Sequence, residues 1–319
     1  MRLLITGASG LLGLNLALHA TQSHTVTGVD RGTLAAAPFD VINQDLLGSN
    51  AIGRILESSR PDAVIHCAAA ADVDFCEGNP QLAHQLNAIV PGRIAAACAS
   101  CGVRLMHIST DAVFDGKKAG SYLESDLAQP SGAYAVTKRA GEEAVLEASS
   151  RAIVARVNFY GWSLGGRRSL AEFFVNNLRL GHGVQGFTDV TFCPMFVADL
   201  AETLIRMLEA DLHGLYHVVG TQAMTKFQFG VAIARRFGFD ENLITPGSVD
   251  GFGLAARRSH NLQLSTHKLS TDLGGNLPDF STGLAKFYTG YTEDYPQKIQ
   301  TYQQVPGPQR PVASHEMAS

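Results

Sequence analysis

Short apolar runs alternate with segments of helical periodicity through the first half of the chain. The apolar runs predict buried strands, and they lie at Arg2–Thr6, His24–Asp30, Ala63–Cys67 and Val103–Ser109. The helical periodicity predicts helices between them, at Leu11–Ala20 and Pro80–Ser100. Strands that alternate with helices are typical of βαβ units, whose parallel sheet is covered on both faces. The predicted fold class is therefore α/β, with a doubly wound parallel sheet.

The pattern changes beyond Arg156, where glycine- and proline-containing stretches separate short helical runs. We expect residues 1–156 to form the first domain. Residues 157–300 should mainly form a smaller C-terminal lobe, with segments that return to the first domain, and it should pack beside the strand carboxyl ends, where such sheets bind ligands. Residues 301–319 are rich in proline and polar residues and lack periodicity. They predict a mobile tail, or an arm that needs another surface for order.

Composition narrows the possible partners. The 319 residues are 45% hydrophobic and 17% charged, as in ordinary globular proteins. A net charge of −4 argues against nucleic acid or a membrane surface as partner, because both require a basic field. Apolar runs stay below the roughly 18 residues of a membrane span, and an early glycine interrupts any signal peptide. The five cysteines are too few and too irregular for a secreted disulfide framework. We therefore expect a cytoplasmic protein, and we predict no metal site.

Three glycines mark the start of the chain as a dinucleotide-binding turn. TGASGLLG places Gly7, Gly10 and Gly13 between a strand and a helix, where they allow a tight turn and close approach of a pyrophosphate. The helix amides then face the phosphates. The sequence thus predicts a Rossmann domain that binds NAD(P)(H). Asp30 ends the second strand, where a carboxylate binds the ribose hydroxyls, whereas Arg31 would pair with a 2′-phosphate. The choice stays open, with a lean to NAD.

A tyrosine and a lysine carry the candidate chemistry. Tyr134 and Lys138 stand four apart in SGAYAVTKRAGEEAV, so a helix places both on one face. A neighbouring ammonium favours the phenolate and lowers the pKa of the tyrosine. The tyrosine can then exchange a proton with a carbonyl or an alcohol as hydride moves. The hydroxyl of Thr110, at the end of HIST, is placed to hold the same oxygen. We predict Thr110, Tyr134 and Lys138 as the catalytic set.

Motifs along nearly the whole chain resemble the extended short-chain dehydrogenase/reductases, and among them the dTDP-4-dehydrorhamnose reductase-like (RmlD-like) branch. They are TGASGLLG, RPDAVIHCAAA, LNA, ISTDAVFDG, YAVTKRAGE, FCPMFVADLA and RSHNLQL. The resemblance implies an NAD(P)H-dependent reductase of a keto group on a nucleotide-activated sugar. Two alternatives stay open. One is a sugar-nucleotide epimerase or dehydratase of the same superfamily. The other is a non-catalytic NAD(P)-binding regulatory subunit that resembles the β subunit of methionine adenosyltransferase. As for a soluble enzyme in general, we expect a homodimer.

Motif and resemblance together assign two sets of binding residues. The cofactor set is Gly7, Gly10, Leu11, Leu12, Gly13, Asp30, Arg31, Asp45, Leu46, Ala68, Ala69, Ala70, Asn87, Tyr134 and Lys138. The substrate set is Asp72, Val73, Asp111, Ala112, Asn158, Phe159, Trp162 and Arg258. Arginines that would grip a diphosphate are Arg167, Arg168, Arg257 and Arg258. Departures from the branch lie on the substrate side, so the identity of the sugar stays open. Ala112 replaces a tyrosine, and Trp162 follows a glycine that it precedes in the branch.

Overall fold

Seven parallel strands form the central sheet of the computed structural model, which describes residues 1–251, 259–302 and 304–306. Their order is β4 (Asp40–Asn43), β2 (Thr25–Asp30), β1 (Arg2–Thr6), β5 (Ala63–His66), β6 (Arg104–Thr110), β7 (Ile153–Val157) and β12 (Gly214–Val218). Every neighbouring pair is parallel. The strand order reverses between β1 and β5, and ligands of such sheets bind at that switch point. The predicted doubly wound sheet is confirmed.

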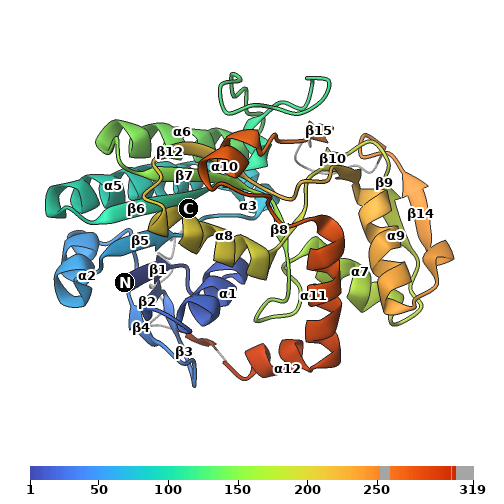
Figure 1. Cartoon of the computed structure of the whole chain (residues 1–319), viewed down its shortest axis with the longest axis horizontal. Helices are drawn as coiled ribbons and strands as arrows, with labels where there is room; N and C mark the ends of the chain where they lie inside the picture. The colour runs from blue at the N-terminus through green and yellow to red at the C-terminus, as the bar shows by residue number, and fades with distance from the viewer. Residues whose placement is uncertain (252–258, 303, 307–319) are drawn as a thin grey trace, which may run out of the picture.

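Helices cover both faces of this sheet (Figure 1). On one face lie α1 (Leu11–Ala20) and α8 (Val197–Glu209), and on the other lie α2 (Ala51–Ser59), α5 (Val90–Cys101) and α6 (Ala133–Ala148). Alternate residues of a strand point to opposite faces. Leu3 and Ile5 of β1 accordingly pack with α1, whereas Leu4 packs with α2 and α5. Burial on both sides explains why these strands appear in the sequence as nearly continuous apolar runs.

The helix predicted at Pro80–Ser100 is interrupted in the structure. It consists of α4 (Pro80–His84), a π-helical turn η1 (Gln85–Ile89) and α5. Pro91 has no backbone N–H to donate to the carbonyl of Asn87, four residues earlier, so regular α-helical bonding fails at this point. Turns of this type are common at functional sites.

Residues beyond β7 build a second lobe (Figure 1). Its helices are α7 (Leu170–Leu178), α9 (Lys226–Phe237), α11 (Phe280–Thr292) and α12 (Tyr295–Gln300). Its strands are β9 (Val184–Phe187) paired with β14 (Ile244–Gly247), and β10 (Thr191–Phe192) between β13 (Met224–Thr225) and β15 (Asn261–Leu262). The core of the lobe is rich in aromatic rings, among them Trp162, Phe229 and Phe287. The chain returns to the central sheet through α8 and β12, so the lobe is not one continuous segment.

The remaining elements are short. They are α3 (Val73–Gly78), the 3₁₀ turns η2 (Asp111–Val113) and η3 (Glu241–Leu243), β8 (Phe159–Tyr160) paired with β11 (Met195–Phe196), and α10 (His267–Asp272). Within the segment predicted as a tail, β16 (Gln304–Pro306) pairs antiparallel with β3 (Gly32–Leu34), and residues 307–319 lie outside the described part. Among the helices of the described residues, none has the length and apolar character needed to cross a bilayer.

Candidate active site

The glycine turn joins β1 to α1 at the centre of the sheet. Gly7 has a φ of +70°, and a Cβ there would lie 2.8 Å from the backbone nitrogen of Ala68. A Cβ on Gly13 would lie 2.1 Å from the Gly7 carbonyl oxygen. The turn therefore requires glycine for its backbone angle at the first position and for close packing of the helix at the other. The N-terminus of α1 has no side-chain cap, so its first amides are available to a ligand.

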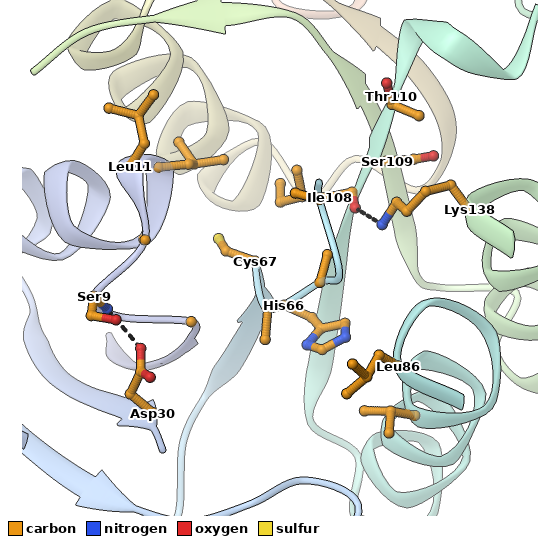
Figure 2. Close-up of a pocket in the computed structure, with 18 of the residues that line it drawn as sticks. Ser9, Leu11, Asp30, His66, Cys67, Leu86, Ile108, Ser109, Thr110 and Lys138 are labelled. Atoms are coloured by element: carbon orange, nitrogen blue, oxygen red, sulfur yellow. Dashed lines mark hydrogen bonds between the residues drawn. The ribbon is translucent and has the colours of Figure 1, made fainter. Parts of the chain in front are cut away.

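A cleft of about 480 Å³ opens at this turn, along the carboxyl edge of the sheet. Figure 2 shows its walls: the glycine turn with Leu11, the end of β5 with His66 and Cys67, and the end of β6 with Thr110. The second lobe adds Phe159 and Arg168, among other residues. The cleft therefore lies at the switch point that the strand order predicts.

Most of the predicted cofactor set lines this cleft. Its members there are Gly7, Gly10, Leu11, Leu12, Gly13, Asp30, Arg31, Asp45, Leu46, Ala68, Ala69, Tyr134 and Lys138. Ala70 and Asn87 lie behind the wall, where Asn87 Oδ1 accepts a hydrogen bond from the Ala70 amide (2.8 Å) and Asn87 Nδ2 donates one to the Ala70 carbonyl (3.0 Å). Asn87 thus braces the segment that follows β5 and does not face the cleft.

Asp30 is fixed at the rim of the glycine turn. Its carboxylate accepts a hydrogen bond from the backbone amide of Ser9 at 2.8 Å (Figure 2). It accepts a second from the backbone amide of Arg31, also at 2.8 Å. The side chain of Arg31 is exposed and also lines the cleft. Asp30 and Arg31, the two candidates for contacting the adenosine ribose, therefore lie at the same rim of the cleft.

Thr110, Tyr134 and Lys138 come together at the other end of the cleft. Lys138 is buried, and its ammonium donates to the carbonyl oxygen of Ile108 (2.6 Å, Figure 2). The ammonium also lies within hydrogen-bonding distance of His107, with 3.4 Å between Lys138 Nζ and His107 Nε2. Burial lowers the pKa of Lys138 to about 8.

The pKa of Tyr134 moves in the direction opposite to the one expected from the sequence. Burial raises the pKa of this phenol to about 12, with a hydrogen bond to Thr110 acting against the rise. The physical reason is that the penalty for burying a phenolate outweighs the stabilisation that the spacing of Tyr134 and Lys138 suggested. At neutral pH the phenol is therefore protonated, a state suited to giving a proton to a carbonyl oxygen.

Asp111 makes contacts with the catalytic set that the sequence did not indicate. Its buried carboxylate accepts hydrogen bonds from Asn158 Nδ2 (2.5 Å) and from the Thr110 hydroxyl (3.1 Å). The Ala112 amide donates to the same hydroxyl oxygen (3.1 Å). Burial raises the pKa of Asp111 to about 6. When Asp111 is ionised, the only proton of the Thr110 hydroxyl is thus directed to its carboxylate.

The structure divides the predicted substrate set. Asp111, Asn158 and Phe159 line the cleft, whereas Asp72, Val73, Ala112 and Trp162 do not. Asp72 caps α3 by accepting a hydrogen bond from the Phe75 amide. Trp162 stacks on Phe287, with ring centroids 4.1 Å apart, and its indole N–H donates to the Phe287 carbonyl. Its ring therefore belongs to the core of the second lobe. Arg257 and Arg258 lie outside the described residues, and of the other two predicted arginines only Arg168 lines the cleft.

Several lining residues were missed from the sequence. Ser9 lies inside the glycine motif, and its amide is the donor to Asp30. His66 is buried and also lines the cleft, with Nδ1 2.7 Å from the Thr6 hydroxyl. Burial raises the pKa of the neighbouring Cys67 thiol to about 12, so this thiol is unreactive. Position at the carboxyl end of β5, where His66 is the last residue and Cys67 the next, is the signal that would have found both.

One group of potential metal ligands lies among the described residues. Asp189, Asp250 and His260 place ligand atoms within 4.8 Å of one another. All three are partly or fully exposed, and exposed acidic groups are common without a metal. The predicted absence of a metal site stays a prediction.

The sheet order, the glycine turn and the Thr–Tyr–Lys group at one cleft define an extended short-chain dehydrogenase/reductase. The family model for the RmlD substrate binding domain matches residues 1–293. The chain belongs to this family.

Three similar proteins illustrate the range of the family. The dTDP-4-dehydrorhamnose reductase of Mycobacterium tuberculosis is 36% identical over 273 residues, which cover 84% of this chain and 86% of that one. Methionine adenosyltransferase 2 subunit beta of Mus musculus is 35% identical over 293 residues, covering 89% and 86%. The solved structure of dTDP-4-dehydrorhamnose reductase from Bacillus anthracis, in complex with NADP, superposes with a TM-score of 0.82 at 27% identity, covering 90% of this chain and 98% of that one.

Proposed function

We propose that this protein is an NAD(P)H-dependent reductase of a keto group on a nucleotide-activated sugar, like the dTDP-4-dehydrorhamnose reductases it resembles. The observation that carries the proposal is the gathering of Thr110, Tyr134 and Lys138 at the cleft that begins at the glycine turn. Cofactor and proton-transfer residues thus share one cavity, as hydride transfer to a carbonyl requires.

The dinucleotide fits the residues that are present. Gly7 and Gly13 leave no space for a Cβ, and the uncapped amides at the start of α1 offer donors for a pyrophosphate. Asp30 and Arg31 would face the adenosine ribose, and Lys138 the nicotinamide ribose. When bound, the reduced nicotinamide supplies the hydride.

The proton comes from Tyr134. Because burial keeps its phenol protonated at neutral pH, the hydroxyl can donate to the carbonyl oxygen as negative charge develops there. Lys138 then favours the phenolate that remains, since its ammonium extends from the same helix face. Of the arginines predicted to bind the substrate's diphosphate, Arg168 of the second lobe is the one that the structure describes in the lining of the cleft. Its guanidinium would pair with the diphosphate.

Turnover tests this proposal against its alternatives. The purified chain should consume NADH or NADPH stoichiometrically with a keto sugar from a panel of nucleotide sugars. An epimerase or dehydratase would convert its sugar without net consumption of cofactor. A folded chain that binds NAD(P)H and converts none of the panel would favour the regulatory-subunit alternative. The mouse relative is named as a subunit of methionine adenosyltransferase 2.

NAD is our preferred cofactor. Asp30 supports it, because a carboxylate held at the ribose rim would repel a 2′-phosphate. Asp30→Ala should then weaken NADH more than NADPH, and Arg31→Ala should leave NADH affinity unchanged. Dissociation constants for both variants with both cofactors would decide. A selective loss of NADPH affinity in Arg31→Ala would instead favour NADP, the cofactor in the Bacillus anthracis structure.

A homodimer is supported by exposed apolar side chains on neighbouring elements. They are Phe75 on α3, Leu82 on α4, Ile89 on η1 and Val136 on α6. A second copy of the chain would bury this face. Light scattering should show a dimer for the wild-type protein and a monomer for Val136→Glu. A monomeric wild type would contradict the proposal of a homodimer.

A cytoplasmic location of the protein likewise stays our expectation.

A further inference from the structure

Glu142 is a completely buried acid on the helix that carries the proposed catalytic pair. It lies four residues beyond Lys138 and eight beyond Tyr134, so the three side chains share one face of α6. None of the roles assigned above uses this carboxylate.

Four hydrogen bonds hold the carboxylate of Glu142. Arg156, on β7, donates from Nε (2.9 Å) and Nη2 (2.7 Å). Ser109, at the end of β6, donates from its hydroxyl (2.6 Å), and Arg139 donates from Nη1 (2.9 Å). Ser109 directly precedes Thr110. The carboxylate therefore joins the three elements α6, β6 and β7 at the end of the sheet where the cleft opens.

Burying this ion pair is costly. Arg156 is 1% exposed and Glu142 is 0% exposed, so both have lost their hydration. A well-packed apolar pair of similar size would often hold the elements together at no lower stability. Fastening α6 to the sheet therefore does not by itself explain why a charge is placed here.

The position of Lys138 supplies a reason. Burial lowers the pKa of Lys138, and Glu142 acts against this as the first of the groups that raise it. The other such group, Cys67, has a pKa of about 12 and is neutral near pH 7. Three further titratable groups near Lys138 are also neutral there: His66 on β5, His107 on β6 and Tyr134 on α6. Arg156 pairs with Glu142 and does not itself shift the pKa of Lys138.

We propose that Glu142 is a positioning residue of the active site, whose negative charge keeps Lys138 in its ammonium form and whose hydrogen bonds hold Ser109, and with it Thr110, in register with α6. The importance of this for turnover rests on the proposed reductase function, since an uncharged Lys138 could not favour the phenolate of Tyr134. The charge state of Lys138 itself can be measured without any sugar.

The test is a titration of Lys138 by NMR in protein labelled with ¹³Cε-lysine, with the signal assigned by its loss in Lys138→Met. In the wild-type protein the midpoint should lie near pH 8. In Glu142→Gln it should fall by roughly one pH unit or more, the usual effect of removing a close opposite charge. Glu143→Gln is the matched control, because Glu143 also pairs with Arg139 but is exposed. The midpoint of the Lys138 titration in Glu143→Gln should equal that of the wild-type protein.

A second variant covers the case in which Glu142→Gln does not fold because Arg156 is left buried without a partner. Glu142→Gln/Arg156→Met removes both charges, and its Lys138 midpoint should also fall below that of the wild type. An unchanged midpoint in whichever of these variants folds would overturn the proposal, as would an equal fall in Glu143→Gln. If a keto-sugar substrate is found, the alkaline limb of its kcat/KM profile should move to lower pH in parallel. Absence of turnover would count against the reductase function and leave the titration result standing.

Discussion

Asp111→Asn should separate the stability of this protein from its activity. The Asp111 carboxyl is 4% exposed and accepts hydrogen bonds from Asn158 and Thr110. An asparagine keeps this shape: its carbonyl oxygen can accept from Asn158, and its amide can donate to the Thr110 oxygen. The variant therefore removes a buried charge while it retains the hydrogen-bond partners.

The magnitude follows from the pKa of Asp111, which burial raises from 3.8 to about 6. Between these values the folded protein holds a proton that the unfolded chain has lost. The associated stability is fully present below the lower value and is lost as the pH rises through the upper one. A difference of about two pH units corresponds to about 3 kcal/mol. The free energy of unfolding of the variant, relative to wild type, should therefore rise by about 3 kcal/mol between about pH 4 and about pH 7.

Urea unfolding across this pH range measures the difference, with Asp115→Asn as control. The backbone amide of Lys117 lowers the pKa of Asp115 from its usual 3.8, so this carboxyl is ionised in the folded and the unfolded protein over most of this range. The stability difference between this control and wild type should therefore stay nearly flat from about pH 4 to about pH 7. If a keto-sugar substrate is identified, Asp111→Asn should also turn it over more slowly, because the Thr110 hydroxyl is reoriented. A stability difference for Asp111→Asn that stays flat or falls from about pH 4 to about pH 7 would refute the reasoning.

Further substitutions test the turn, the catalytic pair and the core of the second lobe. Gly13→Ala places a Cβ 2.1 Å from a carbonyl oxygen of the turn, so it should cost about 1–3 kcal/mol in urea unfolding and weaken NAD(P)H in calorimetry. Gly53→Ala, in open space on α2, should cost nothing, and equal losses would contradict the packing argument. Tyr134→Phe should lower kcat by about 10²-fold or more with cofactor affinity retained. Lys138→Met should act in the same direction, and the double variant should be little slower than the slower single variant. A double variant whose loss of kcat reaches the product of the two single losses would argue against a common role. Trp162→Phe loses the hydrogen bond from the indole N–H, so its free energy of unfolding should be about 1 kcal/mol lower than that of the wild type. If Trp162→Phe instead raised the KM for the substrate and left the free energy of unfolding unchanged, Trp162 would be a substrate-binding residue, as predicted from the sequence.

Local sequence determined the parts of this protein that depend on neighbours along the chain. The apolar runs predicted four of the seven strands of the sheet, β1, β2, β5 and β6, to within a residue at each end, because strands buried on both faces must be apolar throughout. The glycine turn was predictable because its backbone angle and its packing exclude other residues. The spacing of Tyr134 and Lys138 placed both on one helix face.

Tertiary structure decided the rest, because those features depend on what lies across a packed interface. The long helix predicted before β6 contains a π-helical turn just before Pro91, which has no N–H to donate to the carbonyl of Asn87. The side chain of Asn87 is hydrogen-bonded to Ala70 across the interface. Trp162 was read as a substrate residue, although the second lobe takes its ring into the core. The raised pKa of Tyr134 and the burial of Glu142 follow from how deeply α6 is packed against the sheet. Burial and charge surroundings depend on residues far apart in the chain, so no local pattern in the sequence carried them.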